Sequence, residues 1–175
     1  MKITLFDHNE DLCAEWRRAF NDCEEVTVQC CEASELEHGY SAIATAGNSF
    51  GVMTGGIDLA VRDLFGYGLQ DAVQDAILAN AEVLPVGQAL FIGVEDGPHD
   101  AVIYAPTMFT PRTIPSLDVV YSMMVTIFMA TKEKCKTVAI PGLGTGVGGV
   151  PAEEAAKAMR IGYDAARRLM EGDKA

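Results

Sequence analysis

Hydrophobic residues alternate between two spacings along the first part of the chain. Short runs of β-branched and small apolar residues at 2–6, 26–32 and 40–46 predict β-strands. Between the first two runs, apolar residues recur every three to four positions, which predicts a helix over 9–20. The run at 40–46 is almost wholly apolar or small, as in a strand that is buried on both faces.

The same alternation continues to the end of the chain. Further strands are predicted at 87–94, 101–105 and 137–140, and further helices at 57–65, 69–81, 117–131 and 151–170. The chain shows no internal repeat, linker or low-complexity run. We therefore expect one α/β domain over 1–175, with helices on both faces of a mixed, mostly parallel sheet. The tail at 171–175 is expected to fray.

Local signals at the helix ends support these elements. Asp7 or Asn9 is suited to cap the first helix. Pro151 fits the first position of the last helix. Trp16 lies at helical spacing in the first helix, and we assign it to the core. The same spacing assigns methionines 123, 124 and 129 to the buried face of the helix over 117–131.

Composition limits the classes of partner. The 175 residues include 25 Asp and Glu against 13 Lys and Arg, a formal net charge of −12. An acidic chain without a basic stripe has no electrostatic footprint for duplex nucleic acid or for an anionic membrane. The five cysteines contain no Cys-x-x-Cys spacing, and the N-terminus lacks the apolar core of a signal peptide. We therefore expect a cytoplasmic protein with reduced thiols and no membrane or duplex nucleic-acid partner.

The residues that commonly bind metals are dispersed. His8, His38 and His99 show no ligand spacing, so neither a metal site nor a cofactor is expected, and we expect all three to face solvent. Cys30 and Cys31 end a strand that we expect to be buried, which favours inert packing over a nucleophile.

Two glycine-rich turns, at 47–56 and 142–149, carry the candidate chemistry. Each links a predicted strand to a predicted helix, so backbone amides and a helix N-terminus can converge on an anion. Two such turns suggest a ligand with more than one phosphate, bound at the carboxyl ends of the strands. For the second turn, the alternative is that its glycines serve close packing alone. The second turn contains G-x-G-x-x-G, but the further strand and acidic residue of a dinucleotide fold are missing, and so is a Walker A motif.

The two turns also resemble a known family. The stretch 42–58, AIATAGNSFGVMTGGID, is similar to the macro-domain pattern of a buried strand ending Asn-Ala-Ala-Asn-Ser, a glycine-rich loop and Val/Ile-Asp at a helix start. The stretch 141–151, PGLGTGVGGVP, fits the second pattern of that family, Pro-x-x-x-Thr-Gly-x-x-Gly-x-Pro. Macro domains are three-layer α/β/α modules that bind ADP-ribose. The resemblance implies that fold and ADP-ribose, or an ADP-ribosylated substrate, as the partner.

The resemblance assigns expected roles to individual residues. Glu32 matches an acid that binds the adenine amino group, although a solvated acid at a strand end explains it as well. Asn48 matches an asparagine that contacts the distal ribose and takes part in catalysis in many members, or else it only turns the chain. Asp58 is expected to complement the helix start, to bind the ribose or to assist catalysis.

The resemblance places the remaining contacts on the same turns. The other expected ligand-binding residues are Ala33, Ala46, Gly47, Gly55, Gly56, Ile57, Gly142, Gly144, Thr145, Gly146, Val147 and Gly148. Two positions depart from the family pattern. Thr45 replaces its first asparagine, and Gly148 replaces an aromatic residue that packs on the distal ribose in many members, which we expect to open that end of the cleft. Phe50, Phe109 or Tyr104 is a candidate substitute for that aromatic residue, or part of the core or rim.

Three functional hypotheses follow from the resemblance. The first is hydrolysis at the terminal ribose of ADP-ribose that carries a protein, nucleic acid, phosphate or acetyl group, with Asn48 and Asp58 positioning the ribose and a water. The chain shows no obvious strong general base, which favours chemistry assisted by the ligand diphosphate. The second is a non-catalytic ADP-ribose-binding module. The third is a different nucleotide in the same cleft.

Overall fold

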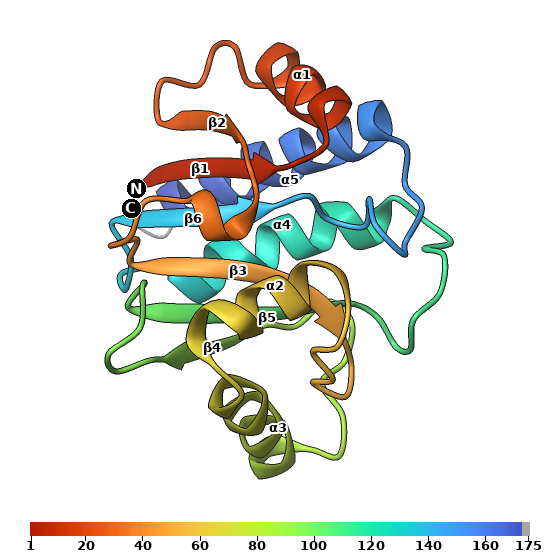
Figure 1. Ribbon diagram of the computed structural model, residues 1–175. Helices are drawn as coiled ribbons and strands as arrows, with labels where there is room; N and C mark the ends of the chain where they lie inside the picture. Colours follow the sequence, from red (N-terminus) through yellow and green to blue (C-terminus); the bar gives the residue numbers. More distant parts are fainter. Residues whose placement is uncertain (173–175) are drawn as a thin grey trace.

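Strands and helices alternate along residues 1–172, the part of the chain described by the computed structural model (Figure 1). The elements are β1 (Lys2–Asp7), α1 (Glu10–Ala19), β2 (Val26–Cys30), the 3-10 turn η1 (Ala33–Glu35), β3 (Ala42–Asn48), α2 (Gly56–Phe65), α3 (Gly68–Asn80), β4 (Leu90–Gly93), β5 (Ala101–Met108), α4 (Asp118–Thr131), β6 (Thr137–Pro141) and α5 (Ala152–Gly172).

The six strands form one sheet in the order β2-β1-β6-β3-β5-β4. All neighbouring pairs are parallel except β4 and β5, which are antiparallel. The predicted mixed, mostly parallel sheet is therefore confirmed. Because β3 and β6 are neighbours and parallel, the turns that follow them emerge at the same edge of the sheet.

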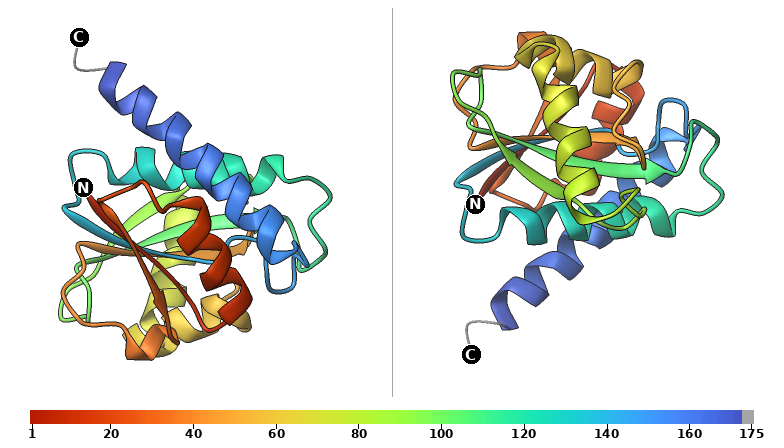
Figure 2. Two further views of the ribbon diagram at one scale, coloured as in Figure 1. Left: turned by 90° about the horizontal axis from the view of Figure 1, so that it is seen from above. Right: turned by 90° about the horizontal axis from the view of Figure 1, so that it is seen from below.

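Helices cover both faces of the sheet, which gives the predicted three layers (Figure 2). One core lies between the sheet and α1, α4 and α5, with Leu5, Trp16 and Met124 fully buried in it. The other core lies between the sheet and α2 and α3, and it contains Phe6 and Tyr104. Apolar burial on both faces provides the main driving force for this arrangement.

The start of α1 follows its sequence signal. Asn9 is the N-cap, and its Oδ1 accepts hydrogen bonds from the amides of Asp11 at 3.0 Å and Leu12 at 3.2 Å. Asp7 supports the cap from outside, because its Oδ1 accepts from the amide of Asn9 at 2.9 Å. Both candidate capping residues therefore contribute, with Asn9 in the capping position.

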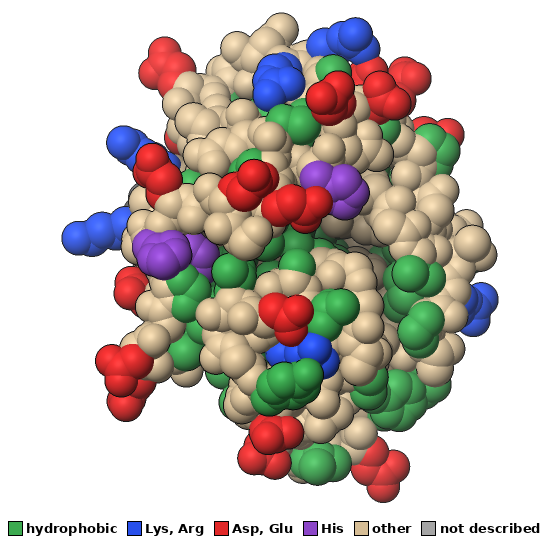
Figure 3. All heavy atoms as spheres, viewed as in Figure 1, with side chains coloured by type: hydrophobic (Ala, Val, Ile, Leu, Met, Phe, Trp, Pro, Cys, Tyr) green, Lys and Arg blue, Asp and Glu red, His purple; other side chains and the backbone are tan. Residues whose placement is uncertain are grey.

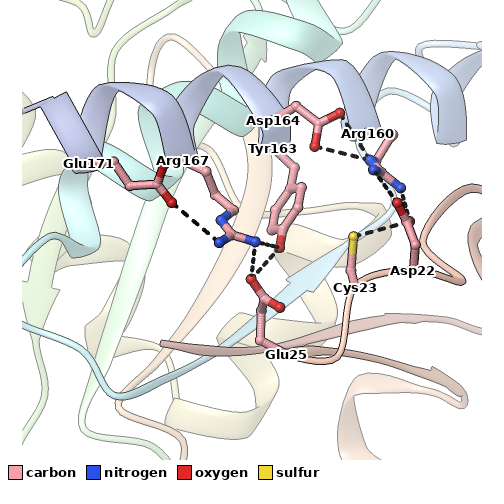
Figure 4. A network of polar contacts seen from close by, with 8 residues as sticks. All are labelled: Asp22, Cys23, Glu25, Arg160, Tyr163, Asp164, Arg167 and Glu171. Carbon is pink, nitrogen blue, oxygen red and sulfur yellow. Dashed lines mark hydrogen bonds and ion pairs between the residues drawn. The ribbon is translucent and has the colours of Figure 1, made fainter.

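Polar contacts fasten α5 to the segment before β2 (Figure 4). Arg160 donates to Asp22 from both terminal nitrogens, at 2.5 and 3.0 Å. The hydroxyl of Tyr163 donates to Glu25 at 2.6 Å, and Arg167 forms an ion pair with the same carboxylate at 2.6 Å. Because α5 follows the second glycine turn, these contacts help to fix the helix that begins beside the candidate site.

Several expectations about burial and element ends are wrong. His99 is 2% exposed, because the rings of His38, Tyr40 and Phe65 surround it at centroid distances of 6.3, 5.5 and 6.0 Å. Burial lowers the pKa of His99, which keeps the ring neutral. Met129 is 39% exposed, since it lies on the outer face of α4.

The edges of the sheet also differ from the prediction. β2 is an edge strand, so Cys30 is exposed rather than at the end of a buried strand. β5 extends three residues beyond the predicted end, because it stays paired with β3 as far as Met108. The helix α5 includes Glu171 and Gly172, which were expected to fray, and residues 173–175 lie outside the described part. None of the helices within residues 1–172 has the length and apolarity to cross a bilayer.

Candidate functional site

The two glycine turns line one cleft at the carboxyl ends of β3 and β6. We call residues 49–55 the first loop and residues 142–151 the second loop. The cleft between them has a volume of ≈ 460 Å³. Twelve predicted site residues line it: Ala46, Gly47, Asn48, Gly55, Gly56, Ile57, Asp58, Gly142, Gly144, Gly146, Val147 and Gly148.

A second hollow of ≈ 210 Å³ adjoins the cleft, and Gly56, Ile57, Gly142 and Gly146 line both. It is lined by the three remaining predicted site residues, Glu32, Ala33 and Thr145. The carboxylate of Glu32 is exposed. The backbone amide of Glu32 donates a hydrogen bond to the Glu35 carboxylate at 2.8 Å. The structure therefore brings all the predicted site residues together around one continuous depression.

The side chain of Asn48 holds the first loop in shape. Its Oδ1 accepts hydrogen bonds from the amides of Phe50 at 3.1 Å and Val52 at 3.4 Å. Its Nδ2 donates to the carbonyl of Val52 at 2.8 Å. Asn48 therefore turns the chain, as one of its two predicted roles requires. One Nδ2 hydrogen is left for a ligand in the cleft that Asn48 lines.

Asp58 points inward from the first turn of α2 and is 4% exposed. Its Oδ1 accepts a 2.5 Å hydrogen bond from the hydroxyl of Thr45 on β3. The hydroxyl of Tyr104 on β5 lies beside Asp58 Oδ2, since both oxygens would crowd a Cβ at Gly47. Asp58 therefore makes no capping bond at the start of α2. The Thr45 hydroxyl, at the position where the family pattern has asparagine, supports Asp58 from below the cleft.

The environment of Asp58 changes its acidity. Burial raises the pKa of Asp58 to about 7, while the hydrogen bond from Thr45 and the neighbouring Tyr104 hydroxyl act in the opposite direction. Within residues 1–172 no charged side chain shifts the pKa of Asp58. A carboxyl group that titrates near neutral pH and lines a cleft is able to exchange a proton there.

The second loop is shaped by its main chain and by its missing side chains. The amide of Val150 donates to the carbonyl of Gly144 at 3.0 Å, and the amide of Ile114 donates to the carbonyl of Gly148 at 2.9 Å. Gly144 has φ +78, which is costly for other residues. A Cβ at Gly148 would lie 2.4 Å from the Gly144 carbonyl oxygen and 2.7 Å from Ile114 Cδ1. Ile114 therefore fills the space beside Gly148 that we expected to be open.

A family model described as "Macro domain" matches residues 44–159, which begin within β3 and include both loops and the first turns of α5. The chain belongs to the macro domain family.

Related proteins and solved structures agree with this assignment. A protein of Aquifex aeolicus (strain VF5) is 37% identical over 136 residues, which cover 77% of this chain and 79% of the relative. The macrodomain of Mycobacterium tuberculosis DarG superposes with a TM-score of 0.63 at 20% identity, over 75% of this chain and 84% of that one. The Trypanosoma brucei macrodomain in complex with ADP-ribose has a TM-score of 0.59 at 19% identity, over 76% and 53%. These structures are similar in fold.

The rim of this macro domain cleft carries exposed aromatic side chains. Phe50 lines the cleft and is 40% exposed, and its ring meets that of Phe109 edge-on at a centroid distance of 4.9 Å. Tyr104 lies fully buried beneath the cleft, so it belongs to the core side of the site. Of the three candidates for the aromatic residue absent at Gly148, Phe50 and Phe109 are therefore at the rim.

Part of the cleft wall comes from residues that no sequence pattern singled out. Thr107 and Met108, at the end of β5, and Thr110 and Pro111 beyond it, also line the cleft. Only the strand order, which puts β5 beside β3, brings this segment to the site. Arg112 is exposed in the same segment but is not among the residues that line the cleft.

The groups at the site that can attract an anion are backbone amides with partial positive charge, not cationic side chains. No Lys or Arg is among the residues that line the cleft or the adjoining hollow. Figure 3 shows acidic side chains scattered over one face of the molecule and a hollow near its middle. Within residues 1–172 no group of three or more His, Cys, Asp or Glu is arranged to hold a metal ion. The site can attract an anion through the amides of two loops and the N-terminus of α2.

Proposed function

We propose that this macro domain binds ADP-ribose in the cleft between its two loops. The observation that carries the proposal is that two glycine-rich loops, on neighbouring parallel strands, face one cleft of ≈ 460 Å³. This volume lies within the range of roughly 300–1,000 Å³ that is typical of small-molecule sites. The fold is shared with the Trypanosoma brucei macrodomain, which was solved in complex with ADP-ribose.

The family resemblance and the two hollows support one orientation of the ligand. The diphosphate lies between the loops, where backbone amides replace cationic side chains. The adenine occupies the adjoining hollow beside Glu32 and Ala33, and the distal ribose faces Asn48 and Asp58. Binding through amides at short range is compatible with a formal net charge of −12, because it does not rely on long-range attraction.

Hydrolysis at the distal ribose is the proposed activity, and Asp58 is the observation that favours it. Asp58 lines the cleft and carries a carboxyl group whose pKa is raised to about 7, so it can give or take a proton near neutral pH. A non-catalytic binding module is the second candidate. It is favoured by Asn48, whose amide is largely committed to the first loop.

Calorimetry with ADP-ribose tests the binding proposal. We expect a single site, and weaker binding by Gly148→Ala, because its Cβ would lie 2.4 Å from the Gly144 carbonyl oxygen and would displace the second loop. A binding heat that is absent at millimolar ADP-ribose would refute the proposal. Turnover assays with mono-ADP-ribosylated protein and with ADP-ribose 1″-phosphate then separate the candidates, since binding without product would support the non-catalytic module.

A further inference from the structure

Tyr104 contacts Asn48, whose side chain holds the first loop, and lies beside the acid Asp58. Its hydroxyl donates to the carbonyl of Asn48 at 2.8 Å and accepts from the amide of the same residue at 3.1 Å. Tyr104 Oη also lies beside Asp58 Oδ2, because both oxygens are close to Gly47. Tyr104 is completely buried, so no water can take the place of these partners.

Gly47 makes this close approach possible. A Cβ built on Gly47 would lie 2.2 Å from Tyr104 Oη and 2.5 Å from Asp58 Oδ2. Both oxygens therefore crowd the space that any other residue would fill. The polar atoms of β3, α2 and β5 meet here directly under the floor of the cleft, where Gly47 and Asp58 also line it.

The hydrogen-bond count depends on whether Asp58 is protonated. A phenol hydroxyl has one proton to donate, and Tyr104 donates it to the Asn48 carbonyl, with the Asp58 carboxyl beside it as a second group that can accept it. When Asp58 is protonated, it can donate its own proton to Tyr104 Oη, and the Tyr104 proton stays on the Asn48 carbonyl. Thr45 then donates to the other carboxyl oxygen of Asp58, and every group has a partner.

Ionisation of Asp58 breaks this closed set. The carboxylic acid loses its proton to solvent through the cleft, and the resulting carboxylate needs a donor for the freed oxygen. Rotation of the Tyr104 hydroxyl supplies that donor and takes its proton from the Asn48 carbonyl, which keeps the long contact from the Gly51 amide, at 3.4 Å. Asn48 is the residue whose side chain shapes the first loop, so the change reaches the ligand-binding surface.

We propose that Tyr104 is a positioning residue, which links the protonation state of Asp58 to the conformation of the first loop, with Thr45 holding the carboxyl in place. The part of this inference that concerns ligand affinity rests on the proposed function. The groups that face Asp58 are Thr45 from β3 and Tyr104 from β5, and within residues 1–172 no charged side chain of η1 or α3 shifts its titration. Tyr104 itself stays protonated, because burial raises its pKa.

NMR of the ligand-free protein provides the first test, since it does not depend on ADP-ribose. The Asp58 carboxyl carbon should titrate near neutral pH, and the amides of Asn48, Phe50 and Val52 should follow with the same midpoint. In Tyr104→Phe the carboxyl should still titrate, but the amide shifts should no longer follow it. Amides that follow Asp58 equally in wild type and Tyr104→Phe, or that do not titrate in wild type, would overturn the proposal.

Thr45→Val keeps the test decisive where Tyr104→Phe fails to fold. Loss of the Thr45 hydroxyl removes a bond that lowers the pKa of Asp58, so the carboxyl midpoint should move to higher pH. The amide midpoints must move with it. Amide midpoints that stay in place while the carboxyl midpoint moves would contradict the link.

ADP-ribose affinity provides the second readout. We expect affinity to fall about 3- to 10-fold from pH 6 to pH 8.5 in wild type, as Asp58 ionises, a coupling of ordinary size between two sites. Asp58→Asn cannot ionise and should show a flat profile. Tyr104→Phe should bind ADP-ribose more weakly at every pH, and its affinity should no longer depend on pH. If the tyrosine were merely structural, the affinity of Tyr104→Phe would be lower by the same factor at every pH and would keep the wild-type pH dependence. If ADP-ribose fails to bind at any pH, the proposed function fails and the NMR test still decides the link.

Discussion

The two loops of the cleft are held by opposite means. Side chains hold the first loop: the amide of Asn48 bonds to the backbone of Phe50 and Val52, and Gln70 accepts from the amide of Met53 at 2.8 Å. The second loop makes its internal bonds between backbone groups and relies on positions without a side chain, such as Gly148. Substitutions that remove side-chain atoms should therefore destabilise the first loop. Substitutions that add side-chain atoms should destabilise the second loop.

This difference matters for the proposed function. A loop held by side chains can respond to a protonation change beneath it, as the contacts of Tyr104 allow. A loop held by its own backbone and by close packing has few alternative arrangements. The expected division is an adjustable first loop near the distal ribose and a rigid second loop that supplies amides to the diphosphate.

The largest effect is expected from an added methyl group in the second loop. In Gly148→Ala the new Cβ would lie 2.4 Å from the Gly144 carbonyl oxygen, so the backbone must shift. This shift should lower the unfolding free energy by roughly 1–3 kcal/mol. ADP-ribose binding should fall with it. Thermal unfolding and calorimetry measure both.

Gly146→Ala is the matched control for this substitution. A Cβ at Gly146 meets no atom within 4 Å, so its unfolding free energy should stay within about 0.5 kcal/mol of wild type. Equal stability of the two variants would show that the second loop tolerates added atoms, which would remove the contrast between the loops.

The second prediction concerns the acid beneath the first loop. Because the folded-state pKa of Asp58, about 7, lies above its unfolded value of 3.8, its contribution to stability is fully present below pH 3.8 and is lost as pH rises through 7. Asp58→Asn does not titrate. Its stability relative to wild type should therefore increase by about 3 kcal/mol between pH 5 and pH 8, since one pKa unit corresponds to about 1.4 kcal/mol.

Denaturant unfolding of both proteins at the two pH values measures this difference. A difference between Asp58→Asn and wild type that is the same at pH 5 and pH 8 would mean that Asp58 does not titrate in this interval. Lower turnover in a more stable Asp58→Asn would indicate that the buried acid is retained for activity at a cost in stability.

Asn48→Ala is the third test, and it removes atoms from the first loop. Two backbone amides and one carbonyl lose their partner, and unfolding should become easier by about 1–2 kcal/mol. If Asn48 also acts on the ribose, turnover should fall more than ADP-ribose binding. Equal losses in turnover and binding would mean that Asn48 only builds the loop.

The sequence predicted the parts of this molecule that depend on local pattern. The layers and the two loops follow from apolar periodicity and from glycine turns after strands, and the third strand is buried as its composition suggested. The capping role of Asn9 is likewise a local signal. The family resemblance added the set of residues that the structure brings together around the cleft.

The remaining features depend on contacts between distant positions. The inward direction of Asp58 depends on Thr45 and Tyr104, which lie on two other elements. Thr107 reaches the cleft only because β5 pairs with β3. His99 is buried by rings from separate segments, and a lone histidine in a polar turn gives no sign of them.

The smallest effect is expected at the far end of the first loop. Gln70→Ala removes the acceptor for the Met53 amide and should lower the unfolding free energy by about 0.5–1.5 kcal/mol. ADP-ribose binding should weaken slightly, because Met53 lies just before the glycines that open α2. Gln70→Glu keeps an acceptor oxygen at the same place and should behave like wild type. If Gln70→Ala and Gln70→Glu lose equal stability, the amide of Met53 does not depend on this acceptor, and the first loop is held by Asn48 alone.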